Sequence, residues 1–396
     1  MKSLRGTVLL MWVKKGRCDA FLQAGIRARQ YVARGLLLAV LVSSLPLSAR
    51  AYQINDKFSI GGVLAGAYQY EEVKDGDDHG RGAIPFQPEL SFRPNENNEF
   101  FTKFGFAAGN GLKGVNSFNL APWAADLEDH VKDINGRNRD YLLTVWYKYT
   151  LRFHESHTLA LTGGIIDATD YIDGNAFAND EYTQFMNAVM VNPPNVFAPS
   201  YDGGGALQWE YGWDIHKFGI TAVAMNVGEN DDGNNYNYFA VQFGYHVSTF
   251  LGEGNYRLII DATNKAFLDP AGDHKENLSA VILSFDQELG EIAGLWLRIG
   301  AQDDAAAIDY QNLYSGGINI SGKLWGREHD NLGLGYAYLN EGNLDIDNSQ
   351  VAELYVRFAL NDYVAITPDV QYMRDKYNDG GATKGIILGL RLTAKF

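Results

Sequence analysis

The stretch Glu353-Leu354-Tyr355-Val356-Arg357-Phe358 decides the fold, because apolar and polar side chains alternate strictly along it. Successive side chains of a β-strand point to opposite faces, so this strand has an apolar face formed by Leu354, Val356 and Phe358 and a polar face opposite. The same period of two recurs at residues 87–93, 256–261, 295–299 and 366–372. The chain is therefore expected to be built from strands that each carry one apolar and one polar face.

Sixteen such segments are expected, each about 10 to 15 residues long, whereas strands of soluble proteins average about five or six. They lie at 57–70, 84–93, 99–109, 139–153, 157–167, 204–214, 218–228, 236–249, 255–264, 277–288, 293–302, 312–325, 330–340, 350–360, 363–373 and 384–396. An even number of antiparallel strands allows a sheet to close with both termini on one side.

The links between these segments alternate between short and long. Short links such as 94–97, 251–254 and 361–362 are followed by long ones such as 110–138 and 168–203. Short turns on the periplasmic side and long loops outside follow this order in outer-membrane barrels. The pattern predicts an all-β, transmembrane antiparallel barrel of about 16 strands, with short helical segments in the long extracellular loops at 124–131 and 179–191.

Aromatic side chains decide which way the apolar faces point. A soluble β-sandwich, the alternative from a different class, would show the same alternation with its apolar faces turned inward. Here aromatic residues gather near the ends of the apolar faces, as at Tyr147, Tyr149, Trp209 and Trp213. Aromatic girdles of this kind mark the two interfaces of a membrane barrel. The apolar faces are therefore expected to meet lipid.

The first 51 residues differ from the remainder in charge. They carry nine Lys or Arg and one acid, whereas residues 52–396 carry 24 bases and 47 acids. The apolar run 35–45 is of signal-peptide length and too short to span a membrane, and Ala49-Arg50-Ala51 offers small residues for cleavage. We expect residues 1–51 to be a cleaved signal peptide, residues 52–396 to be the barrel domain, and the mature chain to be exported to the outer membrane of a Gram-negative bacterium.

The composition excludes several classes. A net charge of −15 argues against nucleic-acid partners, and the single cysteine, Cys18, allows neither a disulfide nor a Cys-based zinc site. The eight histidines form no spaced metal-ligand pair, and no Ser-centred catalytic elbow is present. We therefore expect neither an enzyme nor a cofactor nor a bound metal.

The polar faces of the strands predict the lining of the lumen. Arg and carboxylate side chains can hydrogen-bond the hydroxyl groups of a sugar, and an aromatic ring can stack on its C–H face. A lining of mixed sign favours neutral polyols over anions. The residues expected to line the pore and contact the solute are Arg93, Lys103, Lys148, Arg152, Glu210, Arg257, Asp261, Arg298, Glu353, Tyr355 and Arg357.

The longest connection, 168–203, is the expected constriction. A loop of more than about 15 residues inside a compact domain is usually functional, and a barrel of 16 strands leaves an aqueous lumen that something must narrow if the channel is to select. The residues assigned to this constriction loop are Asp167, Asp170, Asp173, Asn175, Asn179, Asp180 and Glu181.

One known family resembles this sequence. The run from Gly163 to Glu181 resembles the third-loop region of the carbohydrate-selective porins of the OprB family, and residues 107–112, 334–339 and 366–372 are also similar to that family. The resemblance implies a sixteen-stranded outer-membrane channel that admits sugars through a pore narrowed by inward-folded loops.

These observations together predict passive diffusion of small carbohydrates through a water-filled pore. The expected partners are small carbohydrates, outer-membrane lipid and lipopolysaccharide, together with other copies of the chain in a homotrimer. Two alternatives stay open: a general porin or one for sugar acids and other anions, and a secreted β-sandwich that binds glycans.

Overall fold

A computed structural model describes residues 52–154 and 156–396. The expected signal peptide, residues 1–51, lies outside the described residues. Strands are the main secondary structure of the described chain, and within it no helix has the length and apolar character needed to cross a bilayer.

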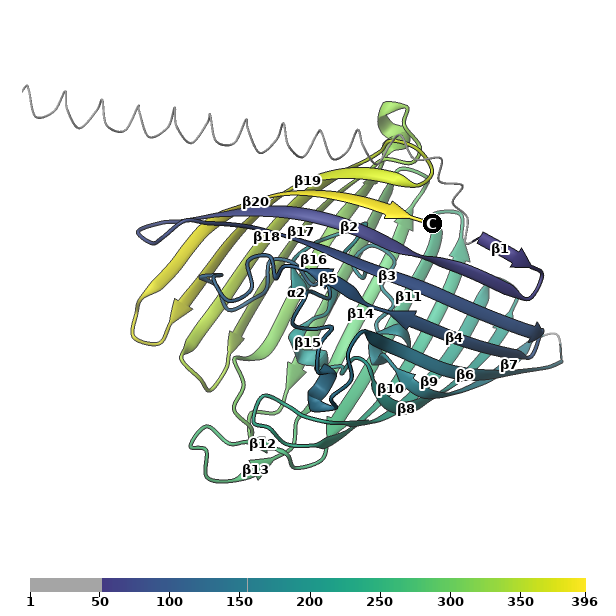
Figure 1. Ribbon diagram of the computed structural model, residues 1–396, viewed down its shortest axis with the longest axis horizontal. Coiled ribbons are helices and arrows are strands. Elements are labelled where there is room, and N and C mark those ends of the chain that lie inside the picture. Colours follow the sequence, from purple (N-terminus) through teal and green to yellow (C-terminus); the bar gives the residue numbers. More distant parts are fainter. Residues whose placement is uncertain (1–51, 155) are drawn as a thin grey trace, which may run out of the picture. The chain divides into compact units, whose positions relative to one another are not determined.

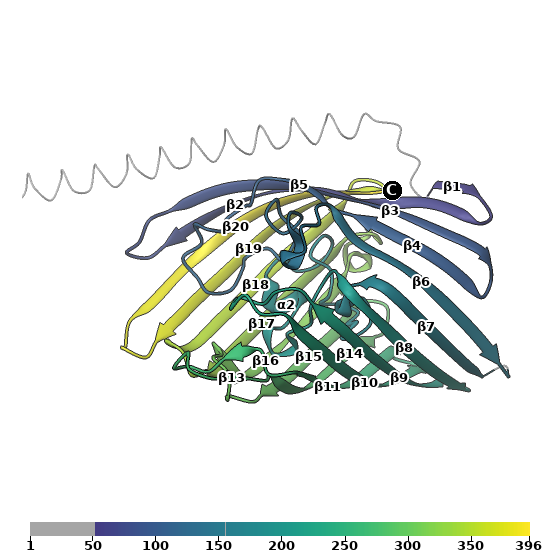
Figure 2. The same cartoon turned by 60° about the horizontal axis from the view of Figure 1, so that its bottom comes forward.

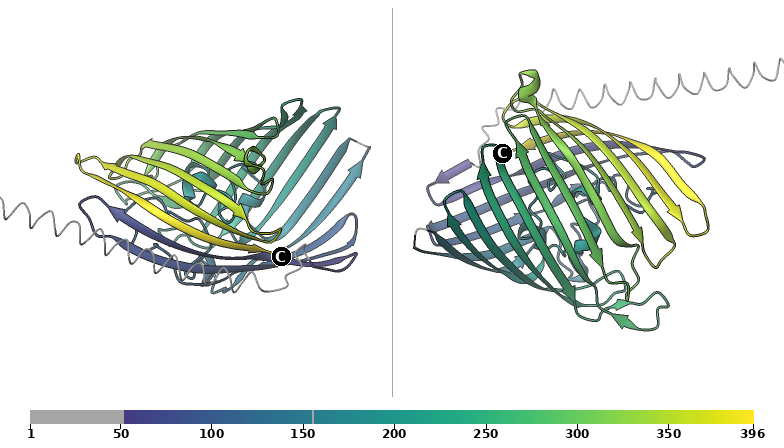
Figure 3. Two further views of the ribbon diagram at one scale, coloured as in Figure 1. Left: turned by 90° about the horizontal axis from the view of Figure 1, so that it is seen from above. Right: turned by 180° about the vertical axis from the view of Figure 1, so that it is seen from behind.

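The strands form one antiparallel sheet that closes on itself (Figure 1). The closing pair is β2 with β20, in register from Val63 opposite Lys395 to Val73 opposite Gly385, and both strands lie side by side in the views of Figure 3. The barrel strands are β2 (Phe58–Val73), β3 (His79–Asn95), β4 (Asn98–Phe104) continued by β5 (Phe106–Ala108), β6 (Leu142–Phe153), β7 (His157–Ile166), β8 (Asp202–Trp213), β9 (His216–Val227), β10 (Tyr236–Thr249), β11 (Gly252–Thr263), β14 (Ser279–Leu289), β15 (Ala293–Gln302), β16 (Tyr310–Ser321), β17 (Asn331–Glu341), β18 (Ile346–Ala359), β19 (Val364–Tyr377) and β20 (Ala382–Lys395).

Counting β4 and β5 as one interrupted strand, the barrel has the sixteen strands that the sequence predicted. Two expected segments, 236–249 and 293–302, match their strands to the residue. The interruption falls at Gly105, just after the register against β6 shifts between Lys103 and Phe104, and a Cβ there would lie only 2.7 Å from the Leu143 side chain. The closed sheet excludes the soluble β-sandwich.

Smaller elements lie outside the barrel wall. A short strand, β1 (Tyr52–Asn55), pairs with the start of β2, and the two-residue strands β12 (Phe267–Leu268) and β13 (Lys275–Glu276) form a hairpin in one long loop. Long loops lie at one end of the barrel and short turns at the other (Figure 2). These two ends are called the long-loop end and the short-turn end below.

Helical segments are short and lie mostly in two long loops. The second loop, residues 109–141, contains the 3-10 turn η1 (Ile134–Gly136), and the third loop, residues 167–201, contains η2 (Ala168–Asp170), α2 (Ala188–Val191) and η3 (Pro194–Val196). A further 3-10 turn, η4 (Gly322–Trp325), replaces the expected end of β16. Short helical segments do lie in the long loops, but of the segment expected at 179–191 only Ala188–Val191 is helical, and residues 124–131 contain no helix.

The alternation along each strand separates an outer from an inner face. In β15, Leu295, Leu297 and Ile299 are exposed on the outside, whereas Trp296 and Arg298 are buried on the inside. Large apolar residues are exposed in this way on every side of the barrel, which is the arrangement of a wall that faces lipid. The core therefore lies inside the barrel, where the second and third loops pack against the wall.

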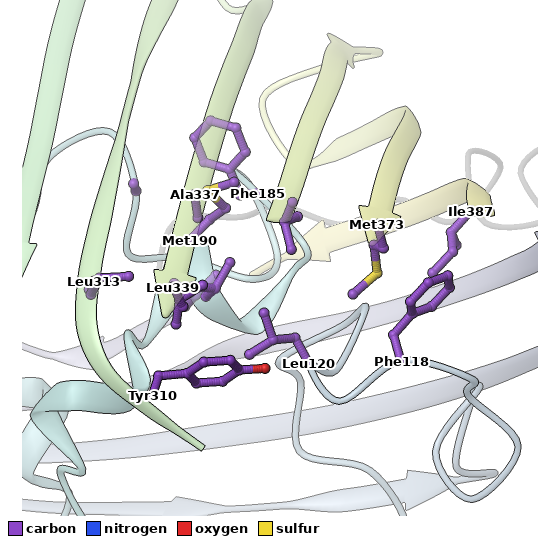
Figure 4. Close-up of a cluster of buried hydrophobic side chains, with 14 of the residues drawn as sticks. Phe118, Leu120, Phe185, Met190, Tyr310, Leu313, Ala337, Leu339, Met373 and Ile387 are labelled. Carbon is purple, nitrogen blue, oxygen red and sulfur yellow. The ribbon is translucent and has the colours of Figure 1, made fainter. Parts of the chain in front are cut away.

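The largest apolar cluster shows this packing (Figure 4). Phe118 and Leu120 come from the second loop, and Phe185 and Met190 come from the third. They pack in one cluster with inward-facing side chains of seven strands, β2 and β15 to β20, among them Leu313, Leu339, Met373 and Ile387. The loops thus fill part of the lumen with a conventional hydrophobic core.

We expect Leu161→Arg to lower the free energy of unfolding by about 2–4 kcal/mol, because a charge on the lipid face near mid-membrane is not hydrated. Leu161 is 59% exposed in the middle of β7. The matched control is Thr158→Arg on the inward face of the same strand, where the partly exposed side chain borders a lumen cavity. Denaturant titration in lipid vesicles measures both, and equal losses would contradict the assignment of the faces.

Candidate functional site

The third loop crosses the lumen and binds the opposite wall. The backbone N–H of Asp173 donates to the side chain of Gln242 on β10 (2.8 Å), and the Asn175 amide donates to the carbonyl oxygen of Phe285 on β14 (3.2 Å). Both Asp173 and Asn175 are buried. The loop therefore lies across the pore rather than in solvent, as the sequence predicted.

Two buried arginines of the wall hold the third loop by its backbone. Arg298 donates to the carbonyl oxygens of Met190 (2.8 Å) and Ala178, and its Nε lies 2.7 Å from Asp173. Arg391 on β20 donates to the carbonyl oxygens of Glu181 (2.6 Å) and Gln184 (2.8 Å). A guanidinium suits this task because its fixed fork of donors can satisfy several carbonyls at once.

A carboxylate on a third strand also anchors the loop. Glu353 on β18 accepts hydrogen bonds from the backbone N–H groups of Met186 and Asn187, the latter at 3.0 Å. The side-chain amide of Asn187 donates to Gln371 on β19 (2.9 Å). Asn187 also caps α2 by accepting from the Val189 N–H (3.2 Å). Wall side chains thus supply the partners that an isolated loop would lack.

The second loop lies against the third and shares its anchors. The backbones exchange two bonds, from Ala124 N–H to Met186 (2.9 Å) and from Ala188 N–H to Ala121 (2.9 Å). The carbonyl oxygen of Pro122 accepts from the side chains of Gln69 (2.8 Å) and Gln371 (2.9 Å). These residues lie on β2 and β19, the two strands that pair with β20. The two loops therefore form one body inside the barrel.

Acidic side chains collect where these loops meet β3 and β4. Asp126 accepts from Tyr201 (2.5 Å) and Gln87 (2.6 Å), and Asp167 accepts from Ser200 (3.1 Å) and from the Thr169 N–H (2.9 Å). Burial raises the pKa of Asp167 to about 7, with a contribution from the neighbouring Asp170. Lys103 interacts electrostatically with this cluster. The cluster is therefore acidic and changes its charge near neutral pH.

A separate cavity of about 670 Å³ opens at the short-turn end of the lumen. Four of the predicted pore-lining residues border it: Arg93, Lys148, Arg152 and Glu210. Arg93 pairs with Glu99 (2.7 Å), Arg152 lies 3.8 Å from Glu96, and Lys148 donates to Gln208 (3.3 Å). These side chains meet water in the lumen.

The other predicted pore-lining residues face inward but meet the protein. Asp261, Arg298, Glu353 and Tyr355 are at most 1% exposed. Arg257 binds Asp286 (2.6 Å) and the third-loop carbonyl of Gly174 (2.6 Å), and Arg357 donates to His329 (2.9 Å). These side chains point into the barrel, as predicted. The loops or neighbouring wall residues bury several of them, so they stabilise the loops or the wall rather than line the solute path.

The assigned loop residues divide in the same way. Asp173, Asn175 and Asp180 make contacts to the wall, Asp180 through Lys395 on β20 (2.9 Å). Asn179 closes a local turn by donating from its backbone to Gln184 (2.7 Å). The neutral side chains Gln69 and Gln371 were not among the predicted pore-lining residues, although their inward positions in alternating strands were a signal for them.

Comparisons with known proteins agree with this architecture. The sequence model described as carbohydrate-selective porin, OprB family, matches residues 99–396. An uncharacterized protein of Aquifex aeolicus (strain VF5) is 28% identical over 331 residues, which cover 84% of this chain and 89% of the relative.

Solved structures share the fold at low identity. The high-pH structure of Pseudomonas putida OprB superposes with a TM-score of 0.65 at 15% identity and covers 86% of this chain and 94% of its own. The outer membrane channel DcaP of Acinetobacter baumannii has a TM-score of 0.53 at 11% identity, with coverages of 88% and 100%.

We expect Arg391→Ala to loosen the third loop, because it removes the guanidinium donors from the carbonyl oxygens of Glu181 and Gln184 and leaves Trp123 Nε1 (3.1 Å) as the remaining donor to Glu181. Amide hydrogen exchange in residues 181–187 should accelerate by about tenfold or more, since bonds to a charged donor contribute about 1.5–3 kcal/mol. In Arg391→Lys, which keeps one compact donor group, the exchange rate should lie between those of the wild type and Arg391→Ala. Arg374→Ala on β19, outside the loop anchors, is the matched control, and unchanged exchange in Arg391→Ala would refute the anchoring role.

We expect the third loop to open more easily as pH rises. Asp167 has a raised pKa of about 7 in the closed loop and an ordinary one near 3.8 when exposed. The closed state therefore binds the proton more tightly, and its stabilisation is complete below about pH 4 and is lost as pH rises to about 7. The free energy of opening of residues 168–172, from hydrogen exchange, should fall by up to about 1.4 kcal/mol per pH unit in that window.

The isosteric variant Asp167→Asn is the control for this pH effect. Asparagine keeps an oxygen for the Thr169 N–H but carries no titrating group. Its opening free energy should be nearly flat between pH 4 and 7. A slope equal to that of the wild type would assign the pH dependence to other groups.

Proposed function

Because this chain belongs to the OprB family of carbohydrate-selective porins, we propose that small neutral sugars cross its lumen by passive diffusion through the passage that the third loop narrows. The protein is an outer-membrane β-barrel channel, and its activity is passage rather than catalysis. The short-turn end then faces the periplasm and the long-loop end faces outside.

The charge of the third loop carries the proposal of neutral solutes. Residues 167–201 contain four Asp and one Glu but no Lys, Arg or His. Wall cations pair with Asp173 and Asp180, and burial raises the pKa of Asp167 to about 7 and that of Glu181 to about 8, so the exposed Asp170 is the main free negative charge of the loop. Anions crossing this acidic segment would be repelled, whereas neutral polyols would not. The passage therefore favours neutral sugars over sugar acids.

Selection in this account is steric and weakly chemical. The anchored loops exclude large solutes, while lumen side chains such as Lys148 and Glu210 offer donors and acceptors to hydroxyl groups. Conduction requires binding that is weak enough to release, so dispersed contacts serve a channel better than one tight site.

The alternative, a general or sugar-acid porin, is supported by a different observation. Lys57, Arg93, Lys148 and Arg152 all border the short-turn cavity, and four bases attract carboxylates. Four acids border the same cavity and offset that attraction, so this alternative ranks second.

We further propose that three copies associate in the membrane, in contact with outer-membrane lipid and lipopolysaccharide. The apolar outer face provides the surface for lipid and neighbouring copies. Native mass spectrometry of detergent-extracted protein should give three chains per particle, and a mass of one chain would contradict the homotrimer.

We expect swelling of proteoliposomes to be faster in glucose than in maltose and slowest in maltotriose, with glucuronate slower than glucose at pH 7.5. Asp170→Asn should raise the rate for glucuronate by about threefold, since one exposed charge is worth up to about 1 kcal/mol. The rate for glucose should stay unchanged, because the exposed Asp170 is replaced by an isostere. Glucuronate entering faster than glucose in the wild type would favour the alternative.

A further inference from the structure

The short-turn cavity is distinct from the passage that the loops narrow. Its lining comes from β3, β4, β6, β7 and β8 and from the adjoining turns, and no residue of the second or third loop borders it. Its volume of about 670 Å³ lies within the range of about 300–1,000 Å³ typical of small-molecule sites. A solute that has passed the loops on this side of the barrel meets this cavity next.

The charges around the cavity balance. Its lining contains four bases, Lys57, Arg93, Lys148 and Arg152, and four acids, Asp56, Glu96, Glu99 and Glu210. Ion pairs at 2.7 Å and 3.8 Å consume two of each sign. A balanced lining gives little electrostatic preference for an ionised ligand of either sign. The cavity differs in this respect from the purely acidic third loop.

Uncharged polar groups complete the lining. Asn95, Asn97 and Asn98 lie at one turn, and Thr150, Thr158 and Gln208 lie on the facing strands. Amides and hydroxyls both donate and accept hydrogen bonds, as do the hydroxyl groups of a sugar. Lys148 and Gln208, already in contact at 3.3 Å, bring a charged donor and an amide together on this wall.

An aromatic pair lies next to the cavity. Phe101 and Trp146 stack with their ring centroids 4.9 Å apart and 21° between their planes. Each is two residues along its strand from a cavity residue, Glu99 on β4 and Lys148 on β6, and therefore shares the inward face. The indole Nε1 of Trp146 is buried without a hydrogen-bond partner. Aromatic faces next to the cavity suit the C–H surface of a pyranose ring.

We infer that this cavity is a second binding station, which holds a neutral sugar of mono- or disaccharide size on the periplasmic side of the loops. The inference rests on the proposed function, since it assumes that sugars enter the lumen. Two weak sites in series keep a solute in the pore while allowing release from either one.

Sided block of ionic current tests the inference. Maltose is added only to the short-turn side of channels inserted in known orientation, and binding is read from interruptions of the current. Lys148→Met and Gln208→Leu should each weaken block by about fivefold, which corresponds to about 1 kcal/mol for one hydrogen-bonding group. Gln208→Leu changes no charge, so its effect reports hydrogen bonding alone.

The matched control is Lys217→Met. Lys217 lies near the short-turn end of β9, in inward register with Gly219 and Thr221, but does not border the cavity. The Lys217→Met variant removes one positive charge at the same mouth of the barrel, as Lys148→Met does. Maltose should therefore block this variant as strongly as it blocks the wild type. Equal loss in Lys217→Met and Lys148→Met would assign the effect to the mouth potential and overturn the site.

Three further results separate the possible failures. Block unchanged in both cavity variants overturns the inference even where proteoliposomes admit sugars. If glucuronate blocks more tightly than maltose and this block is lost in Lys148→Met, the cavity is a site for anions and not for neutral sugars. If proteoliposomes swell in no sugar but maltose still blocks the channel current and the cavity variants weaken that block, the proposed function is overturned and the binding station stands.

Discussion

Closure of the sheet between β2 and β20 is the constraint on which the structure depends. Hydrocarbon offers no partner for backbone N–H and C=O groups, so a sheet can cross a membrane only without free edges. The paired register from Val63 to Val73 removes the last edge. Once the ring is closed, its outer faces must be apolar and its polar faces must turn inward, which is the alternation seen along every strand.

Sixteen strands enclose more space than the inward side chains can fill. The second and third loops occupy that space, and burying them creates a need for hydrogen-bond partners far from their own secondary structure. Arg298, Arg391 and Glu353 meet this need by binding loop carbonyl and N–H groups directly. Charged residues of the wall therefore have a structural role where they contact the loops. Those around the short-turn cavity stay available to water and solute.

The sequence predicts the wall well because the period of two depends only on neighbours along the chain. Glu353 and Arg298 were placed on the inner face for that reason, and they lie there. Their partners were beyond prediction, because Arg298 meets Met190 at a separation of 108 residues and Arg391 meets Glu181 at 210. The third loop has no repeating pattern, so its length indicated a constriction but its path depends on contacts with distant strands. The expected helix at 124–131 failed for a related reason: contacts with the third loop and β3 hold that segment in turns.

The central claim is that the anchored third loop sets the size and selectivity of the pore. Its most direct test is the single-channel conductance of a variant in which residues 174–190 are replaced by a short Gly-Ser linker, compared with the wild type in the same bilayer. The account predicts a conductance several-fold higher and the loss of discrimination between glucose and maltotriose. An unchanged conductance from a correctly folded barrel would show that the constriction lies elsewhere.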